Sequence, residues 1–102
     1  GANAVPIIQA GNDELQIGEI YPNPFDALSS LDITVVKPCH ISAVIIDNIG
    51  VIKGIAMDDE MSPGKYALNL DAKNLIPGMY TLRITYTDDC TRRIYAKKMI
   101  VW

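Results

Sequence analysis

The sequence predicts an all-β fold, a sandwich of about seven antiparallel strands. Apolar and polar residues alternate with a period of two in several segments, which is typical of strands with one buried face. Turn-forming residues separate the apolar segments at intervals of about six to ten residues, a spacing that suits hairpins and is too short for crossover helices. Together these patterns favour an immunoglobulin-like β-sandwich.

The predicted strands follow one another along the whole chain. The clearest alternation lies in "LDITVVK" (31–37), "KYALNLD" (65–71) and "MYTLRITY" (79–86). Two segments are apolar on both faces, as central strands are: "HISAVIID" (40–47) and "VIKGIAM" (51–57). The first strand is predicted in "ELQIGEIY" (14–21) and the last in "RRIYAKKMIVW" (92–102). We expect "NPFDALSSL" (23–31) to be a loop or a single helical turn, because it lacks a sustained apolar stripe.

The stretch "YPNPF" follows the first predicted strand and contains two prolines, Pro22 and Pro24. Each proline fixes its own φ, lacks an N–H and pushes the residue before it towards extended geometry. The sequence therefore predicts a stiff corner at which a strand ends. We expect Tyr21 and Phe25, on either side of Asn23, to pack onto the core.

Several turn residues have a conformational explanation. Gly50 in "DNIG" and Gly78 in "IPGMY" stand where the chain reverses, and glycine takes positive φ there without steric cost. Asp71 ends a predicted strand, and we expect its side chain to accept hydrogen bonds from nearby backbone amides. These residues are expected to build the fold rather than to carry chemistry.

Composition limits the class of protein. The chain has 102 residues, of which 49% are hydrophobic and 21% charged, so it is long enough for one domain with its own core. The absence of a long apolar run argues against a membrane span. The net charge of −3 gives no general attraction to phosphate backbones, so nucleic acid is not an expected partner. The basic residues gather in one place only: Arg92, Arg93, Lys97 and Lys98.

The chain divides into two parts by composition. Residues 1–14 resemble the remnant of a cleaved purification tag followed by a linker or by the mature start of an exported protein. Residues 15–102 are predicted to form the β-sandwich domain. No signal peptide is recognisable in the sequence as it stands.

Catalytic and metal chemistry have little support. His40 adjoins Cys39, but neighbouring residues of a strand point to opposite faces, so a thiol and an imidazole at these positions do not meet. The acidic residues Asp58, Asp59 and Glu60, together with Asp88 and Asp89, lack the ligand spacing of a calcium loop and are expected to be solvated in turns. We therefore expect no cofactor, no metal and no enzymatic activity.

The two cysteines allow two readings. In a seven-stranded sandwich, Cys39 falls in the turn between the second and third strands and Cys90 in the turn between the sixth and seventh, at the same end of the fold. A disulfide is thus possible and would suit an exported protein. Two free thiols are an equal alternative, because a bridge requires a narrow range of Cα separations.

Four elements in order resemble the C-terminal sorting domain (type A) of the type IX secretion system of Bacteroidetes. They are "YPNPF", "IIDNIGVI", "GKYALNLDAKNLIPGMYTLRI" and "AKKMIV". The resemblance extends from Ile17 to the end of the chain. It places family positions at Tyr21, Pro22, Asn23, Pro24, Phe25, Asp47, Gly50, Gly78 and Tyr80. The immunoglobulin-like module of the flagellar hook-capping protein is related to the same pattern.

The resemblance implies a function at the end of the chain. The secretion machinery of this family reads the terminal segment, which here corresponds to Lys97, Lys98, Met99, Ile100 and Val101. The implied partners are the secretion translocon proteins, and the implied route leads through the periplasm to the cell surface or the medium. The alternative is a free-standing secreted or periplasmic module that binds a protein or a glycan.

Overall fold

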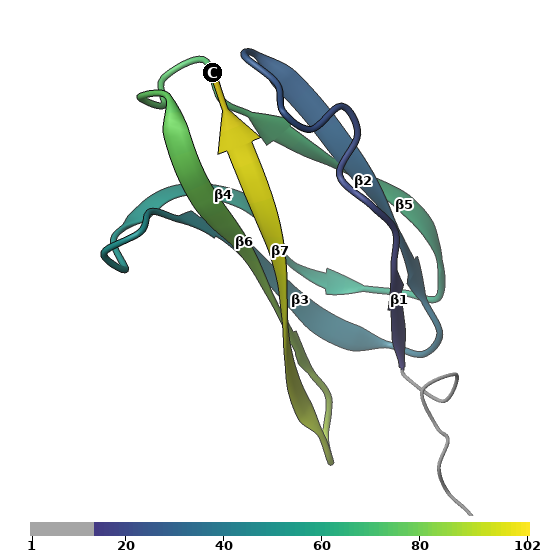
Figure 1. The fold of residues 1–102 in the computed structure, drawn as a ribbon. Coiled ribbons are helices and arrows are strands. Elements are labelled where there is room, and N and C mark those ends of the chain that lie inside the picture. The colour runs from purple at the N-terminus through teal and green to yellow at the C-terminus, as the bar shows by residue number, and fades with distance from the viewer. Residues whose placement is uncertain (1–13) are drawn as a thin grey trace, which may run out of the picture.

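The structure is a computed structural model that describes residues 14–102, and these form seven antiparallel strands in two layers (Figure 1). The strands are β1 (Leu15–Ile17), β2 (Leu28–Val35), β3 (Cys39–Ile46), β4 (Ile52–Met61), β5 (Gly64–Asp71), β6 (Gly78–Thr87) and β7 (Arg92–Val101). One sheet has the order β1-β2-β5 and the other β4-β3-β6-β7. The predicted all-β, immunoglobulin-like sandwich is confirmed.

The described part of the chain contains no helix. The loop predicted for residues 23–31 is correct only as far as residue 27, because β2 already begins at Leu28 and pairs there with β5. In particular, none of the described residues forms a helix suited to crossing a membrane. The predicted tag or linker at residues 1–14 lies outside the described residues except for Glu14.

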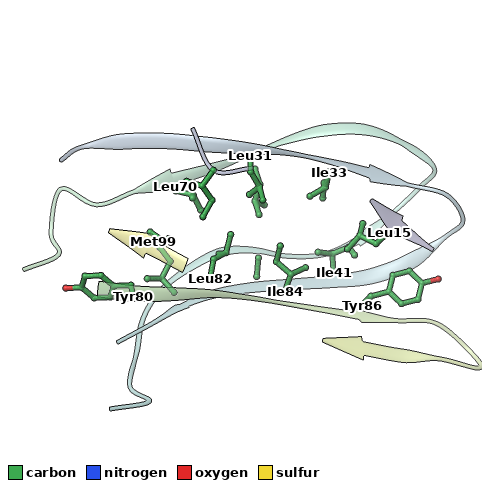
Figure 2. Close-up of a cluster of buried hydrophobic side chains, with 14 of the residues drawn as sticks. Leu15, Leu31, Ile33, Ile41, Leu70, Tyr80, Leu82, Ile84, Tyr86 and Met99 are labelled. Atoms are coloured by element: carbon green, nitrogen blue, oxygen red, sulfur yellow. The ribbon is translucent and has the colours of Figure 1, made fainter. Parts of the chain in front are cut away.

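The period-two segments build the core between the two sheets. On β2 and β5, Leu31, Ile33, Leu68 and Leu70 are at most 2% exposed, and their polar neighbours point outward. Opposite them lie the inward residues of the larger sheet, among them Ile41, Leu82, Ile84, Tyr86 and Met99. Figure 2 shows these side chains meeting in the space between the layers. Burying each such aliphatic side chain contributes about 1.5–3 kcal/mol, so the alternation decides which face of each strand turns inward.

The position of β4 corrects one expectation. β3 is a central strand, between β4 and β6, but β4 lies at the edge of its sheet. The prediction that "VIKGIAM" is central was therefore wrong, and Ile52 and Ile55 remain 53% and 69% exposed.

The acidic residues 58–60 lie within β4 rather than in a turn, which is a second correction. The strand extends that far because its polar residues find polar partners on β3. Asp58 lies opposite Ser42, and Glu60 lies opposite His40.

Two predicted turns are confirmed. In the β3–β4 turn, the Asp47 carboxylate accepts hydrogen bonds from the backbone N–H groups of Ile49 (3.0 Å) and Val51 (2.9 Å). These bonds, with that of Val51 the strongest, lower the pKa of Asp47. Gly50 completes the turn with a φ of 91°, which other residues rarely adopt. After β5, Asp71 accepts a hydrogen bond from the backbone of Lys73 at 2.9 Å.

Candidate interaction site around the C-terminal strand

The five predicted sorting residues lie on β7, and their side chains point in different directions. Met99 and Val101 are buried in the core, at 0% and 3% exposed. Lys98 and Ile100 point to the opposite side, the outer face of the four-stranded sheet, where they lie beside Thr81 and Met79 of β6. Only part of the predicted signal is thus displayed on the outer face.

The Lys97 side chain lies on the same face of β7 as that of Met99. Lys97 is nearer the middle of the strand, however, and is only partly buried. Its ammonium group binds the Glu19 carboxylate at 3.0 Å. Arg93 binds Glu14 in the same way, at 3.1 Å, four residues earlier on the strand. These ion pairs connect β7, in one sheet, to the residues on either side of β1, in the other sheet. The two basic side chains are therefore engaged in contacts within the domain.

The "YPNPF" corner lies along the free edge of β7. The Asn23 side chain donates a hydrogen bond to the carbonyl of Lys98 and accepts one from the N–H of Ile100, each at 3.0 Å. The Phe25 backbone continues the contact: its N–H donates to Ile100 and its carbonyl accepts from Trp102, also at 3.0 Å each. We call Asn23 and Phe25 the clasp. A proline-rich corner therefore replaces the strand that β7 lacks on this side.

The two aromatic residues of the corner behave differently. Phe25 is 3% exposed and packs in the core, as predicted. Tyr21 is 81% exposed, so the prediction that it packs onto the core was wrong. Its backbone pairs with Ser30 of β2, and this pairing leaves its ring on the solvent side. Both peptide bonds that precede the prolines are cis.

Gly78 and Tyr80 support the terminal segment from β6. Gly78 pairs with Val101, and Tyr80 pairs with Met99, in the register of the β6–β7 hairpin. Tyr80 is 8% exposed, and its hydroxyl donates to the carbonyl of Ile76. The terminal residues are thus held by β6 on one edge and by the clasp on the other.

A second group of polar residues lies at the opposite end of the sandwich. The His40 ring lies between two carboxylates of β4, with Nδ1 2.7 Å from Glu60 and Nε2 2.7 Å from Asp58. These contacts, with Glu60 the stronger, raise the pKa of His40. His40 lies on the outer face and Cys39 is buried, so the two do not form a nucleophile and base pair. An open hollow of about 510 Å³ adjoins them.

The β6–β7 turn at this end is organised by Asp88. Its carboxylate accepts hydrogen bonds from the Tyr86 hydroxyl and from the backbone N–H groups of Cys90 and Thr91, and it pairs with Lys37 at 3.2 Å. These contacts, the Tyr86 hydroxyl first, hold the pKa of Asp88 well below its usual range. The backbone contacts of Asp88 hold the turn, and its contacts with Tyr86 and Lys37 attach the turn to β6 and to the segment after β2.

Cys39 and Cys90 are free thiols in the structure. Cys39 begins β3 and is buried, which raises the pKa of its thiol, whereas Cys90 is exposed in the β6–β7 turn. A disulfide between them stays a prediction. Among residues 14–102 no three histidine, cysteine or acidic side chains are grouped closely enough to hold a metal ion.

Sequence reasoning missed two features of this region. The first is the clasp, because the pairing of Asn23 with β7 joins positions that no local pattern relates. The second is the outer face of the four-stranded sheet, where Ile52, Ile55 and Met79 are exposed. The sequence does contain a signal for the second: "HISAVIID" and "VIKGIAM" are apolar on both faces, a pattern that predicts central strands.

Comparison with protein families gives a match over most of the chain. The family model described as a secretion system C-terminal sorting domain matches residues 19–101. This range begins just before the clasp and ends at the last residue of β7, so it contains both. A comparison with curated proteins gave no match. The further relation to the flagellar hook-capping module stays a prediction.

Proposed function

Because the chain belongs to the family of secretion system C-terminal sorting domains, we propose that it directs a cargo across an outer membrane through the type IX secretion system. In this proposal the domain is not an enzyme. The cargo precedes it in the chain, passes through the periplasm, and reaches the cell surface or the medium. The partners are proteins of the translocon, which bind the folded domain at its terminal strand.

The contacts of β7 support this proposal most directly. The clasp and β6 hold the backbone of residues 98–102 from both edges. This arrangement displays the Lys98 and Ile100 side chains in a defined orientation. A binding site on rigid elements is more precise than one on a loop. The polar clusters described above, around Asp47, Asp88 and His40, are occupied by contacts within the domain, so the terminal strand is the better candidate for recognition.

The proposal is tested with a reporter protein fused ahead of Gly1 in a host that has a type IX system. We expect the wild-type fusion to leave the cell and a fusion carrying Lys98→Ala with Ile100→Ser to accumulate in the periplasm. Lys98 is exposed and Ile100 is 36% exposed, and surface substitutions usually change stability by less than about 0.5 kcal/mol. The loss of export should therefore not follow from unfolding.

Two controls sharpen the experiment. Lys65→Ala removes an exposed charge from the other sheet and should leave export unchanged. Lys97→Ala breaks the ion pair with Glu19 without changing the outer face, so it separates recognition of that lysine from recognition of Lys98. If the wild-type fusion itself remains in the periplasm, the sorting role is wrong and a free-standing module that binds a protein or glycan takes its place.

A further inference from the structure

The outer face of the four-stranded sheet is apolar over its half nearest the C-terminal end of β7. On β3, Val44 and Ile46 are 9% exposed but lie outside the cluster packed between the sheets. The register places Val44 beside Ile55 and Ile46 beside Ile52, on the edge strand β4. The core residues of β3 alternate with them, so both pairs turn away from the core.

Two further apolar residues extend this surface to β7. Met79 of β6 and Ile100 of β7 are cross-strand partners, 52% and 36% exposed. A shallow hollow of about 290 Å³ adjoins Met79 and is lined also by Asn48 and Lys98. We call Val44, Ile46, Ile52, Ile55, Met79 and Ile100 the apolar outer face.

The outer face of the three-stranded sheet provides a comparison within the same molecule. Apart from Leu28 at its start, the outward residues of β2 are Ser30, Asp32 and Thr34, and their partners on β5 are Asn69, Ala67 and Lys65. That face is mostly polar, as is usual when one side of an antiparallel sheet meets water. The contrast is informative because exposed apolar patches mark interaction sites on proteins.

Two cations belong to the apolar outer face. Arg83 lies beside Val44 on the neighbouring strand, and Lys98 lies beside Thr81, which in turn lies beside Ile46. Both are exposed, and neither forms an ion pair with any residue in the described range 14–102. By contrast, Lys97 and Arg93, whose side chains are turned the other way, are already paired with glutamates. The unpaired charges of this face are therefore positive.

We propose that the apolar outer face, with Arg83 and Lys98, is the docking surface of this domain for a translocon protein that presents apolar side chains flanked by carboxylates. The inference rests on the proposed sorting function. It adds which face of the sheet binds the translocon protein and which kinds of side chain that protein presents. Charge complementarity of this kind fixes the register of a complex and excludes partners of the wrong sign.

The surface fits such a partner better than a second copy or a lipid surface. Within residues 14–102, the acidic residues on the outer face of this sheet are Asp58 and Glu60, and both are bonded to His40. The same face of a second copy therefore offers Arg83 and Lys98 no uncommitted carboxylate from this part of the chain. A net charge of −3 opposes binding to anionic lipid, where only two unpaired cations of this face would contribute.

The first test uses the reporter fusion with Ile55→Asp and Met79→Asp, which place carboxylates in the apolar contact. We expect export to fall roughly tenfold or more, as happens when central contacts of an interface are lost. The matched control, Ala67→Asp with Asn69→Asp, puts the same charges on the polar face of the other sheet and should leave export unchanged. Circular dichroism and thermal unfolding of each purified variant show whether it folds. Where an aspartate variant does not fold, Ile55→Thr with Met79→Gln replaces it.

The second test reverses charge. Arg83→Glu with Lys98→Glu should abolish export, whereas Lys65→Glu should not. Sedimentation of the purified domain and flotation with vesicles of anionic and neutral phospholipid test the other occupants. A dimer that Met79→Asp dissociates, or vesicle binding that Arg83→Glu abolishes, would overturn the proposed partner.

The outcomes separate this inference from the function on which it rests. If the wild-type reporter is not exported, the sorting function is wrong and the docking proposal falls with it. If the wild type and the Ile55 and Met79 variants are exported equally well, the sorting function stands and only the docking surface is wrong.

Discussion

The side chain of Asn23 accepts a hydrogen bond from the backbone N–H of Ile100 at 3.0 Å, across 77 residues of sequence. The same side chain donates to the carbonyl of Lys98, so one amide contacts β7 on both sides of Met99. An asparagine side chain carries the donor and the acceptor of a peptide group, and here it takes the place of a neighbouring strand. The end of an exposed edge strand is thereby covered, which reduces unwanted pairing with other chains.

Replacing Asn23 by alanine should release this edge. We expect Asn23→Ala to lower the free energy of unfolding by about 1 kcal/mol, the usual net contribution of such hydrogen bonds. The Ile100 amide should exchange its hydrogen faster, as measured by NMR. Asn69→Ala, on the exposed face of the other sheet, is the control and should change neither quantity. Unchanged exchange at Ile100 would show that the clasp does not protect β7.

The two aromatic residues of the corner should differ in their effect on stability. Phe25 is 3% exposed, so Phe25→Ala should cost about 3–5 kcal/mol through lost burial and the cavity left behind. Tyr21 is 81% exposed, so Tyr21→Ala should change stability by less than about 0.5 kcal/mol. Urea unfolding measures both. An equal loss of stability in the two variants would contradict the burial of Phe25 and the exposure of Tyr21.

The pH dependence of stability should show the contribution of the His40 ion pairs to the folded state. Its pKa is raised in the folded state by Glu60 and Asp58, so protonated His40 stabilises the fold. This contribution is fully present below the unfolded pKa, near 6.5, and is lost as pH rises through the higher folded value. We therefore expect His40→Gln to destabilise the domain at pH 5.5 more than at pH 8.5.

The experiment is urea unfolding of both proteins at the two values. His40 is the only histidine in the chain, so no other imidazole titrates in this window. The effect should be modest because the His40 side chain is 37% exposed and solvent screens the ion pairs. A larger loss at pH 8.5 would reverse the sign and contradict the interpretation.

Glycine should be required at position 50, in the β3–β4 turn, but not at position 54, within β4. Gly50 has a φ of 91°, so Gly50→Ala should destabilise by about 1–2 kcal/mol although nothing lies within 4 Å of the added Cβ. At Gly54 the nearest atom to an added Cβ is the Ile45 Cδ1, at 3.7 Å, and φ is not in the positive range. Gly54→Ala should be neutral or slightly stabilising. Thermal unfolding distinguishes the two.

Local patterns predicted the fold well because each depends on neighbours in sequence. The alternation in residues 79–86 places Leu82 and Ile84 in the core, and the Asp47 carboxylate caps a turn of its own segment. What the sequence could not reveal is which strand lies at an edge. The segments 40–47 and 51–57 are similarly rich in apolar residues, and only the strand order β4-β3-β6-β7 shows that β4 lies at the edge of its sheet.

The candidate site could be predicted only in part, because it too depends on how the strands are arranged. The resemblance places the signal at residues 97–101, but the side-chain directions along β7 come from its pairing with β6. The commitment of Lys97 to Glu19, unlike the unpaired Lys98, depends on the meeting of β7 with the chain around β1. Two adjacent lysines in the sequence thus have different environments in the fold.

The clasp has a consequence for the size of the smallest unit that carries the signal. A short peptide with the sequence of residues 92–102 would contain all five residues of the predicted sorting signal, 97–101, but none of the groups of the clasp and β6 that orient them. An isolated strand or hairpin is at best marginally stable in water. The peptide would therefore present Lys98 and Ile100 in many conformations. The presented shape depends on residues separated by most of the domain, so we expect the proposed signal to be transferred to a new cargo only with the entire sandwich.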